Sequence, residues 1–124
     1  MFYEKALTEN IIGAAIEVHR ALGAGLLESA YQVCLAREFT LRGLSFEQER
    51  PVPVIYKDVK LDCGYRMDFL VNDKVVVELK AVDQMHPVYE AQLLTYLKLT
   101  GYKVGLLINF NVPLLKNGII RRVL

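Results

Sequence analysis

Residues 64–81, GYRMDFLVNDKVVVELKA, contain two stretches in which apolar and polar side chains alternate around a short turn. Alternation with period two, in stretches rich in valine and aromatic residues, is typical of β-strands. The dipeptide Asn72-Asp73 is favourable turn chemistry. The pattern therefore predicts a β-hairpin with strands at 65–71 and 74–80.

The register of this hairpin follows from which side chains must share a face. Directly opposed residues lie on the same face of a sheet, and a slip by one residue moves every side chain to the other face. We therefore expect Val71 to lie opposite Val75 across an odd loop, Asn72-Asp73-Lys74. The further pairs expected in this register are Phe69–Val77, Asp68–Glu78, Met67–Leu79 and Arg66–Lys80.

This register predicts one apolar and one polar face for the hairpin. The apolar face would carry Tyr65, Met67, Phe69, Val71, Val75, Val77 and Leu79. Asp68, Glu78 and Lys80 would share the other face, which would be left for water or substrate. Two carboxylates and an ammonium group gathered in this way can form a site for a divalent metal ion.

The same charged residues have a second interpretation. Like charges directly opposite each other destabilise a sheet, and diagonal Asp68–Lys80 and Arg66–Glu78 contacts would relieve that repulsion. A lattice of surface ion pairs is a common feature of sheets. On spacing alone, both interpretations remain open.

The rest of the chain predicts a mixed sheet flanked by helices. Helical periodicity and end signals place helices at 5–22, 27–42 and 87–100. Further strands are expected at 46–56, as an edge or bulged strand because of its two prolines, at 103–109 and at 118–124. The predicted order is ααβββαβ(β), an α/β fold with a right-handed parallel crossover into strand 103–109.

Length and composition set outer limits. A chain of 124 residues predicts a single domain, 1–124. Its apolar runs are shorter than the roughly 18–20 residues that span a bilayer, and its polar, acidic start does not resemble a signal peptide. With only Cys34 and Cys63 and no C-x-x-C motif, we expect no disulfide framework or zinc site, both cysteines buried, and a cytoplasmic location.

Charge is distributed unevenly although the net charge is only +1. Residues 98–124 contain five basic side chains and no acidic ones, whereas residues 1–97 contain 10 basic and 14 acidic side chains. An acidic site beside a basic end suits a polyanion held next to metal ions. Scattered, solvated surface charge is the alternative.

Two further polar pairs lie one helical turn apart. Glu28 and Tyr31 belong to the second predicted helix, and Gln92 and Tyr96 to the third, where we expect them to face away from its apolar side. An acid near a helix N-terminus also stabilises the helix, and a tyrosine in an apolar stripe is commonly a core residue. Spacing does not separate these interpretations from functional ones.

With these motifs in place, the chain resembles the GxxExxY family, a branch of the PD-(D/E)XK nuclease-like superfamily. GLLESAY at 25–31 matches the motif that names the family. YRMD at 65–68 and VELK at 77–80 match the superfamily core, with Met67 in place of the proline of the PD pair. QLLTY at 92–96 is similar to the Q-x-x-x-Y element, and the resemblance covers roughly residues 5–122.

The resemblance implies a restriction-endonuclease-like fold and a catalytic site that uses Mg²⁺ or Mn²⁺. Asp68, Glu78 and the Leu79 carbonyl would be metal ligands, and Glu28 a ligand or the neighbour of one. Lys80 would position or activate water and stabilise charge on the phosphate. Gln92 and Tyr96 would orient the site or contact phosphate.

The implied function is metal-dependent hydrolysis of phosphodiester bonds in DNA, with RNA as a second substrate class. Contacts with nucleic acid are expected from Tyr31, Arg66, Lys98, Lys103, Arg121 and Arg122. The alternatives are a non-catalytic nucleic-acid-binding or scaffold module that keeps the fold, and hydrolysis of another phosphate compound. A homodimer or a partner protein would supply grip on DNA that a short chain lacks.

Overall fold

The computed structural model describes residues 3–124 and is built around a mixed five-stranded sheet. The strands lie in the order β1 (Phe46–Pro51), β4 (Arg66–Val71), β5 (Val75–Lys80), β6 (Val104–Asn109) and β7 (Ile119–Val123). Strands β5 and β6 run parallel, and every other neighbouring pair in this sheet is antiparallel. The predicted α/β class with a mixed sheet is confirmed.

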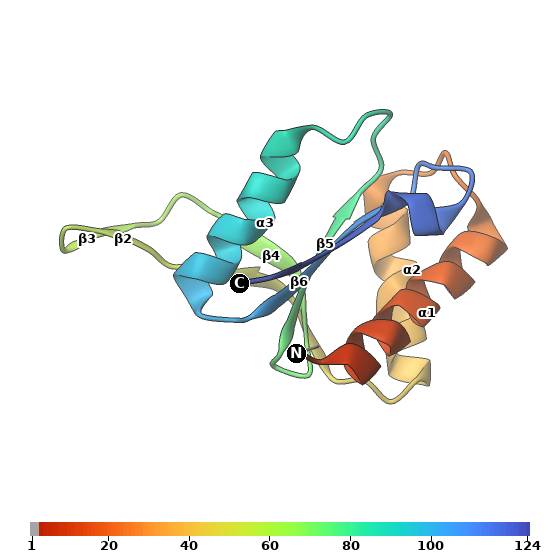
Figure 1. Cartoon of the computed structure of the whole chain (residues 1–124), viewed down its shortest axis with the longest axis horizontal. Helices are drawn as coiled ribbons and strands as arrows, with labels where there is room; N and C mark the ends of the chain where they lie inside the picture. Colours follow the sequence, from red (N-terminus) through yellow and green to blue (C-terminus); the bar gives the residue numbers. More distant parts are fainter. Residues whose placement is uncertain (1–2) are drawn as a thin grey trace.

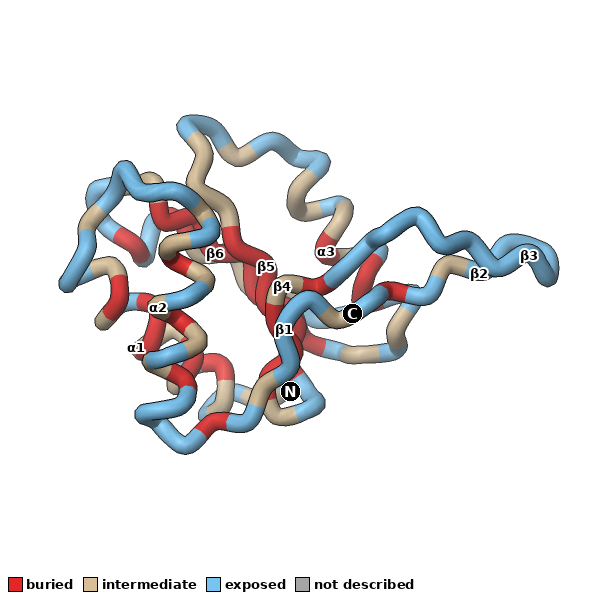
Figure 2. The backbone as a smooth tube through the Cα atoms, turned by 180° about the vertical axis from the view of Figure 1, so that it is seen from behind, coloured by how far each residue is buried: buried red, intermediate tan, exposed pale blue. Residues whose placement is uncertain are grey.

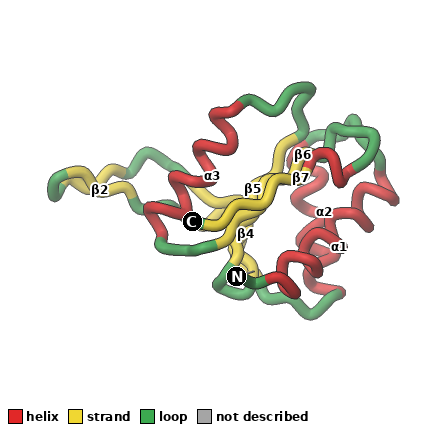
Figure 3. The backbone as a smooth tube through the Cα atoms, viewed as in Figure 1, coloured by secondary structure: helices red, strands yellow, loops and turns green. Residues whose placement is uncertain are grey.

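Helices cover both faces of this sheet. Helices α1 (Lys5–Leu22) and α2 (Glu28–Leu41) lie on one face, and α3 (Pro87–Thr100) lies on the other (Figure 1, Figure 3). A single 3₁₀ turn, η1 (Leu115–Gly118), precedes β7. The predicted helices 5–22 and 87–100 have the predicted bounds, and α2 is shorter by one residue at each end than the predicted helix 27–42. No helix within residues 3–124 is long and apolar enough to cross a membrane.

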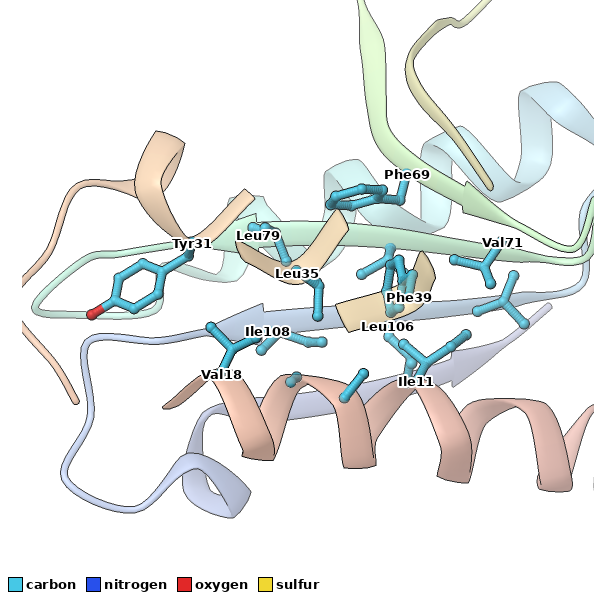
Figure 4. Packing of buried hydrophobic residues seen from close by; sticks show 14 of the residues in the cluster. Ile11, Val18, Tyr31, Leu35, Phe39, Phe69, Val71, Leu79, Leu106 and Ile108 are labelled. Carbon is cyan, nitrogen blue, oxygen red and sulfur yellow. The ribbon is translucent and has the colours of Figure 1, made fainter. Parts of the chain in front are cut away.

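The larger core lies between the sheet and the pair α1 and α2. Apolar side chains at helical spacing on both helices pack onto alternate residues of the central strands, as Figure 4 shows. The fully buried members include Ile11, Leu35, Phe39, Phe69, Leu106 and Ile108. The apolar residues at helical spacing and those at strand spacing therefore pack together in one apolar layer.

A second core lies between the sheet and α3. It joins Leu70, Val76 and Leu107 of the sheet to Leu93 and Leu97 of the helix. Gly105 allows the close approach, because a Cβ atom there would lie 2.7 Å from Cδ1 of Leu93. The hairpin face that we expected to be left for water or substrate is thus largely buried under α3, and that expectation is wrong.

The hairpin of β4 and β5 has the predicted loop and register at its turn end. Val71 pairs with Val75 and Phe69 with Val77 across the loop 72–74. Asn72 and Asp73 adopt positive φ angles of 52° and 54°, conformations that asparagine and aspartate tolerate better than most residues. The N–H of Lys74 closes the turn by donating to the Val71 carbonyl at 3.0 Å.

The register prediction fails farther from the turn. The paired residues of β4 and β5 end at Phe69 and Val77, so the expected Met67–Leu79, Asp68–Glu78 and Arg66–Lys80 pairs are not formed. Met67 packs in the core beneath α3, whereas Leu79 packs in the core beneath α1 and α2. The physical reason is that side-chain carboxylates take over the backbone hydrogen bonds at this point, as described below.

The predicted strand 46–56 is also wrong in its extent. Strand β1 ends at Pro51, and β2 (Val54–Tyr56) pairs instead with β3 (Val59–Leu61) in a separate hairpin. This hairpin projects from the body of the molecule and is largely exposed (Figure 2). Proline removes a ladder donor, and Lys57 and Asp58 supply the positive φ angles, 44° and 70°, of a two-residue turn.

The cysteines only partly follow expectation. Cys34 is partly buried and Cys63 is exposed, and both are free thiols. Burial of Cys63 was therefore wrongly expected. It lies in the exposed segment that leads from β3 to β4, where there is no core for it to enter.

Candidate active site

A pocket of about 290 Å³ lies where β4 and β5 separate, at the end of β5 remote from the hairpin turn. It gathers side chains from α2, β1, β4, β5 and α3. Its lining consists of Glu28, Glu49, Gly64, Tyr65, Arg66, Asp68, Glu78, Lys80, Gln92 and Tyr96. All six side chains predicted to be catalytic therefore line one pocket, together with Arg66.

Two carboxylates form the floor of the pocket and hold its strands together. The backbone N–H of Asp68 donates to Oε2 of Glu78 at 2.9 Å, and the N–H of Leu79 donates to Oδ2 of Asp68 at 2.7 Å. Each acid thus accepts a backbone hydrogen bond from the other's strand. These bonds replace the ladder between β4 and β5 and let the strands diverge.

Glu78 is buried and Asp68 partly buried, and the two carboxylates are close enough to influence each other's ionisation. Burial, followed by the negative charge of Asp68, raises the pKa of Glu78 to about 9, although the hydrogen bond from the Asp68 backbone N–H acts in the opposite direction. Burial is also the largest cause that raises the pKa of Asp68. Glu78 is the more deeply buried of the two, with 5% of its surface exposed. Without a counter-ion, we place a proton on Glu78 at neutral pH.

Lys80 brings a cation to the same pocket. Its backbone carbonyl accepts the Phe110 N–H at 2.9 Å, which fixes the end of β5. Its ammonium nitrogen lies 4.6 Å from the ring centroid of Tyr89, at the start of α3. This cation–π contact orients the lysine head, and nothing in the sequence pattern pointed to Tyr89.

A further acid, Glu49, was missed by the sequence analysis. It lies on the edge strand β1 with a positive φ of 52°, and it lines the pocket beside Glu28. Its charge contributes to raising the pKa values of Glu28 and Asp68, although burial is the larger cause for both. Gln32 of α2 donates to Glu49 at 2.7 Å and ties β1 to that helix.

Gln92 and Tyr96 of α3 both line the pocket, but one expectation about them is wrong. Tyr96 is only 5% exposed and packs with Leu93 and Leu97, so it belongs to the apolar side of the helix. Burial, followed by the negative charges of Glu78 and Asp68, raises the pKa of Tyr96 to about 12. The phenol therefore stays protonated and offers a hydrogen-bond donor to the pocket.

Tyr31 has a structural position and does not reach the surface. It is fully buried, and its ring stacks on Phe110 with centroids 4.4 Å apart. Its hydroxyl donates to the Gly23 carbonyl at 2.5 Å and accepts the Leu26 N–H at 3.2 Å. The expected contact of Tyr31 with nucleic acid is contradicted by this burial. The tyrosine instead holds the loop between α1 and α2, and so the start of α2 that carries Glu28.

Tyr31→Phe is expected to lower the free energy of unfolding by about 1–3 kcal/mol, because two backbone groups lose a buried partner. Urea denaturation measures this change. Tyr56→Phe is the matched control, because Tyr56 is 63% exposed on the projecting hairpin. Equal stability of Tyr31→Phe and the wild type would contradict the structural role.

The expected basic end does not lie beside the pocket. Lys98 and Lys103 lie near the start of β6, which pairs with the start of β5, whereas the pocket is at the end of β5. Arg121 donates to Thr8 and to the Tyr3 carbonyl, and Arg122 forms an ion pair with Glu90. Their contacts with nucleic acid stay predictions, now for surfaces away from the pocket.

The histidines are not part of the acid cluster. Nε2 of His19 lies 2.8 Å from the Val112 carbonyl oxygen, and the His86 ring contacts Tyr89. Within residues 3–124, no three histidine, cysteine, aspartate or glutamate side chains form a group that would hold a metal ion. Asp68 and Glu78 supply neighbouring carboxylate oxygens, which are the kind of donor that hard divalent cations prefer.

The comparisons with known proteins agree with this geometry. No curated protein and no solved structure matches the chain. The model of the PD-(D/E)XK nuclease superfamily matches residues 5–123, which include every strand, all three helices and the whole pocket. Three helices around a mixed five-stranded sheet are consistent with the restriction-endonuclease-like fold. The chain therefore belongs to the PD-(D/E)XK nuclease superfamily, whose members point to a nuclease-like function.

Proposed function

We propose that the chain is a Mg²⁺- or Mn²⁺-dependent nuclease that hydrolyses phosphodiester bonds of DNA, and that it belongs to the GxxExxY branch of the superfamily. The observation that carries the proposal is the pairing of buried Glu78 with partly buried Asp68 in one pocket with Lys80. A surface lattice of ion pairs would not bury a glutamate to this extent or raise its pKa to about 9.

Asp68 and Glu78 would hold the metal ion, with the Leu79 carbonyl and Glu28 as the further ligands implied by the motif. A divalent ion held there supplies a Lewis acid that activates water and neutralises charge on the phosphate. Burial makes these carboxylates costly to ionise without a counter-ion, so a cation replaces the proton that Glu78 otherwise keeps. We also propose Glu49 as a further source of negative charge for a hydrated ion.

The remaining side chains act on the substrate and on water. Lys80 would donate hydrogen bonds to the attacking water or to the phosphate oxygens. Tyr96 carries a protonated hydroxyl, and Gln92 an amide, on the opposite wall of the pocket. Both can donate to phosphate. Arg66 is exposed at the pocket rim and would attract the polyanion.

The proposal is tested by incubating the purified chain with duplex DNA, single-stranded DNA and RNA in the presence of Mn²⁺ or Mg²⁺. We expect DNA cleavage that EDTA abolishes, and heat release on titration with Mn²⁺. Asp68→Asn should lose both, whereas Asp58→Asn, on the exposed turn of the projecting hairpin, should keep both.

The proposal would be overturned if none of the substrates is cleaved and titration with Mn²⁺ releases no heat. Mn²⁺ binding without cleavage would favour a non-catalytic module that keeps the fold. Cleavage by Asp68→Asn at the wild-type rate would contradict the proposed role of Asp68 as a metal ligand.

A further inference from the structure

An apolar groove of about 400 Å³ adjoins the candidate active site. It runs along the outer side of α3, where Val88, Ala91, Thr95 and Leu99 recur at helical spacing. Val54 and Tyr65 form its other wall. Val88 is 63% exposed and Leu99 is 37% exposed, so these side chains are not used by the core.

The groove and the active-site pocket are continuous. Tyr65, Gln92 and Tyr96 line both of them. The ring of Tyr65 is 47% exposed and meets the ring of Tyr96 edge to face, with centroids 6.4 Å apart. A molecule that places a phosphate beside a metal ion held by Asp68 and Glu78 would therefore have an apolar groove within reach of the group next to that phosphate.

A third hollow, of about 760 Å³, meets the other two at Tyr65. Its lining includes three cationic side chains, Arg50, Lys60 and Arg66, against one carboxylate, Asp62. Lys60 and Arg66 are exposed, whereas Arg50 pairs with Glu47 and Asp73. The surface around Tyr65 thus offers a cationic hollow, an acidic pocket and an apolar groove next to one another.

We propose that this surface binds single-stranded nucleic acid, with an unstacked base in the apolar groove and the neighbouring phosphates near Lys60 and Arg66. The proposal rests on the proposed function and names its substrate class. A base within a duplex is stacked and paired, so it can enter a side groove only after it leaves the helix. Every base has a π face, and stacking on an aromatic ring such as Tyr65 is tolerant of sequence.

The charged side chains near the groove favour nucleic acid as its ligand over an apolar peptide or a lipid tail. A strand in which phosphates and bases alternate matches a site where cationic side chains, an acid pair and an apolar groove adjoin one another, whereas an apolar peptide or a lipid tail would leave the charged groups without partners. Tyr65 lines all three hollows. A nucleic-acid strand that occupies all of them would therefore pass over the ring of Tyr65.

The test compares three probes by fluorescence anisotropy, with Ca²⁺ in place of Mn²⁺ to suppress cleavage. The probes are a labelled oligothymidine, an abasic oligomer of the same length and charge, and a blunt duplex. Stacking is worth about 1–3 kcal/mol per base, so oligothymidine should bind at least about 5-fold more tightly than the abasic oligomer. An oligouridine arm shows whether RNA shares the site.

Filling the groove should abolish that preference. The double variant A91L/T95L is expected to bind oligothymidine and the abasic oligomer equally. Thr40→Leu, at an exposed position of α2, is the matched control and should keep the preference. Lys60→Ala should weaken both oligomers to the same degree, because it removes only charge.

No preference for bases in the wild type, or a preference that survives A91L/T95L, overturns the proposal. The nuclease function and the base-binding groove can be refuted independently of each other. Duplex cleavage that is insensitive to A91L/T95L would leave the nuclease function standing without the groove. Base-dependent binding without any cleavage would leave the groove standing without the nuclease function.

Discussion

Lys80→Met is expected to lower the rate of DNA cleavage by about 10²- to 10⁴-fold while leaving Mn²⁺ binding close to that of the wild type. Its ammonium group lines the same pocket as Asp68 and Glu78, and its position is fixed by β5 on one side and by the Tyr89 ring on the other. It is the only cation that the strand β5 brings into the pocket, and methionine preserves its length without its charge or donors.

Single-turnover cleavage at saturating Mn²⁺ measures this loss, and calorimetry checks that the metal still binds. Lys116→Met is the matched control, because Lys116 is exposed on η1 and does not line the pocket. Wild-type activity in Lys80→Met would remove Lys80 from the mechanism. If Lys80→Met loses Mn²⁺ affinity but keeps its cleavage rate at saturating Mn²⁺, the lysine organises the acid pair and does not act on the substrate.

The central hairpin shows how much of the fold can be predicted from the sequence. Parity required an odd loop between Val71 and Val75, and the structure has that loop and that pairing. The same parity rule assumes that β4 and β5 stay paired, and it therefore fails at Asp68 and Glu78, where carboxylates accept the backbone hydrogen bonds. The deviation from regular sheet geometry coincides with the candidate site.

The neighbours of the acid pair were only partly predictable. Motif resemblance selected Glu28, Gln92 and Tyr96, and all three line the pocket. Glu49 was missed because its placement depends on a positive φ within an edge strand, which no local pattern indicates for a glutamate. Tyr89 was missed because its role is a contact across the fold with Lys80.

The projecting hairpin shows a different limit. Val54–Tyr56 and Val59–Leu61 flank Lys57-Asp58, which forms a two-residue turn with positive φ angles. We instead expected a single edge or bulged strand over 46–56, which joins the first of these strands to β1 and treats the two prolines as a local irregularity. Because this hairpin is exposed, burial periodicity gave no signal for it.

Glu78→Gln is expected to stabilise the protein in the absence of metal, by an amount that grows as the pH rises from about 4.5 to about 9. Glu78 ionises near 4.5 when unfolded and near 9 when folded, so the folded state binds the extra proton throughout this interval. Its contribution to stability is fully present below the unfolded pKa and is lost as the pH approaches the folded one. Glutamine carries no proton to lose, so the variant escapes that loss.

Thermal unfolding in EDTA at pH 5 and pH 9 measures the gap between Glu78→Gln and the wild type. The gap should be small at pH 5 and on the order of several kcal/mol at pH 9, since one pKa unit corresponds to about 1.4 kcal/mol. Glu9→Gln, an exposed acid on α1, should show no such gap. Equal stability of Glu78→Gln and the wild type at pH 9 would contradict a buried, protonated glutamate.

Adding Mn²⁺ should narrow the difference in stability between Glu78→Gln and the wild type. The wild type exchanges the proton of Glu78 for the metal ion and gains about 2.7 kcal/mol when the metal is at 100 times its dissociation constant. Glu78→Gln offers a neutral amide in place of a carboxylate and should gain much less. A variant that is more stable than the wild type without metal, and inactive with it, would show that the charge of Glu78 is kept for binding a cation at the cost of stability.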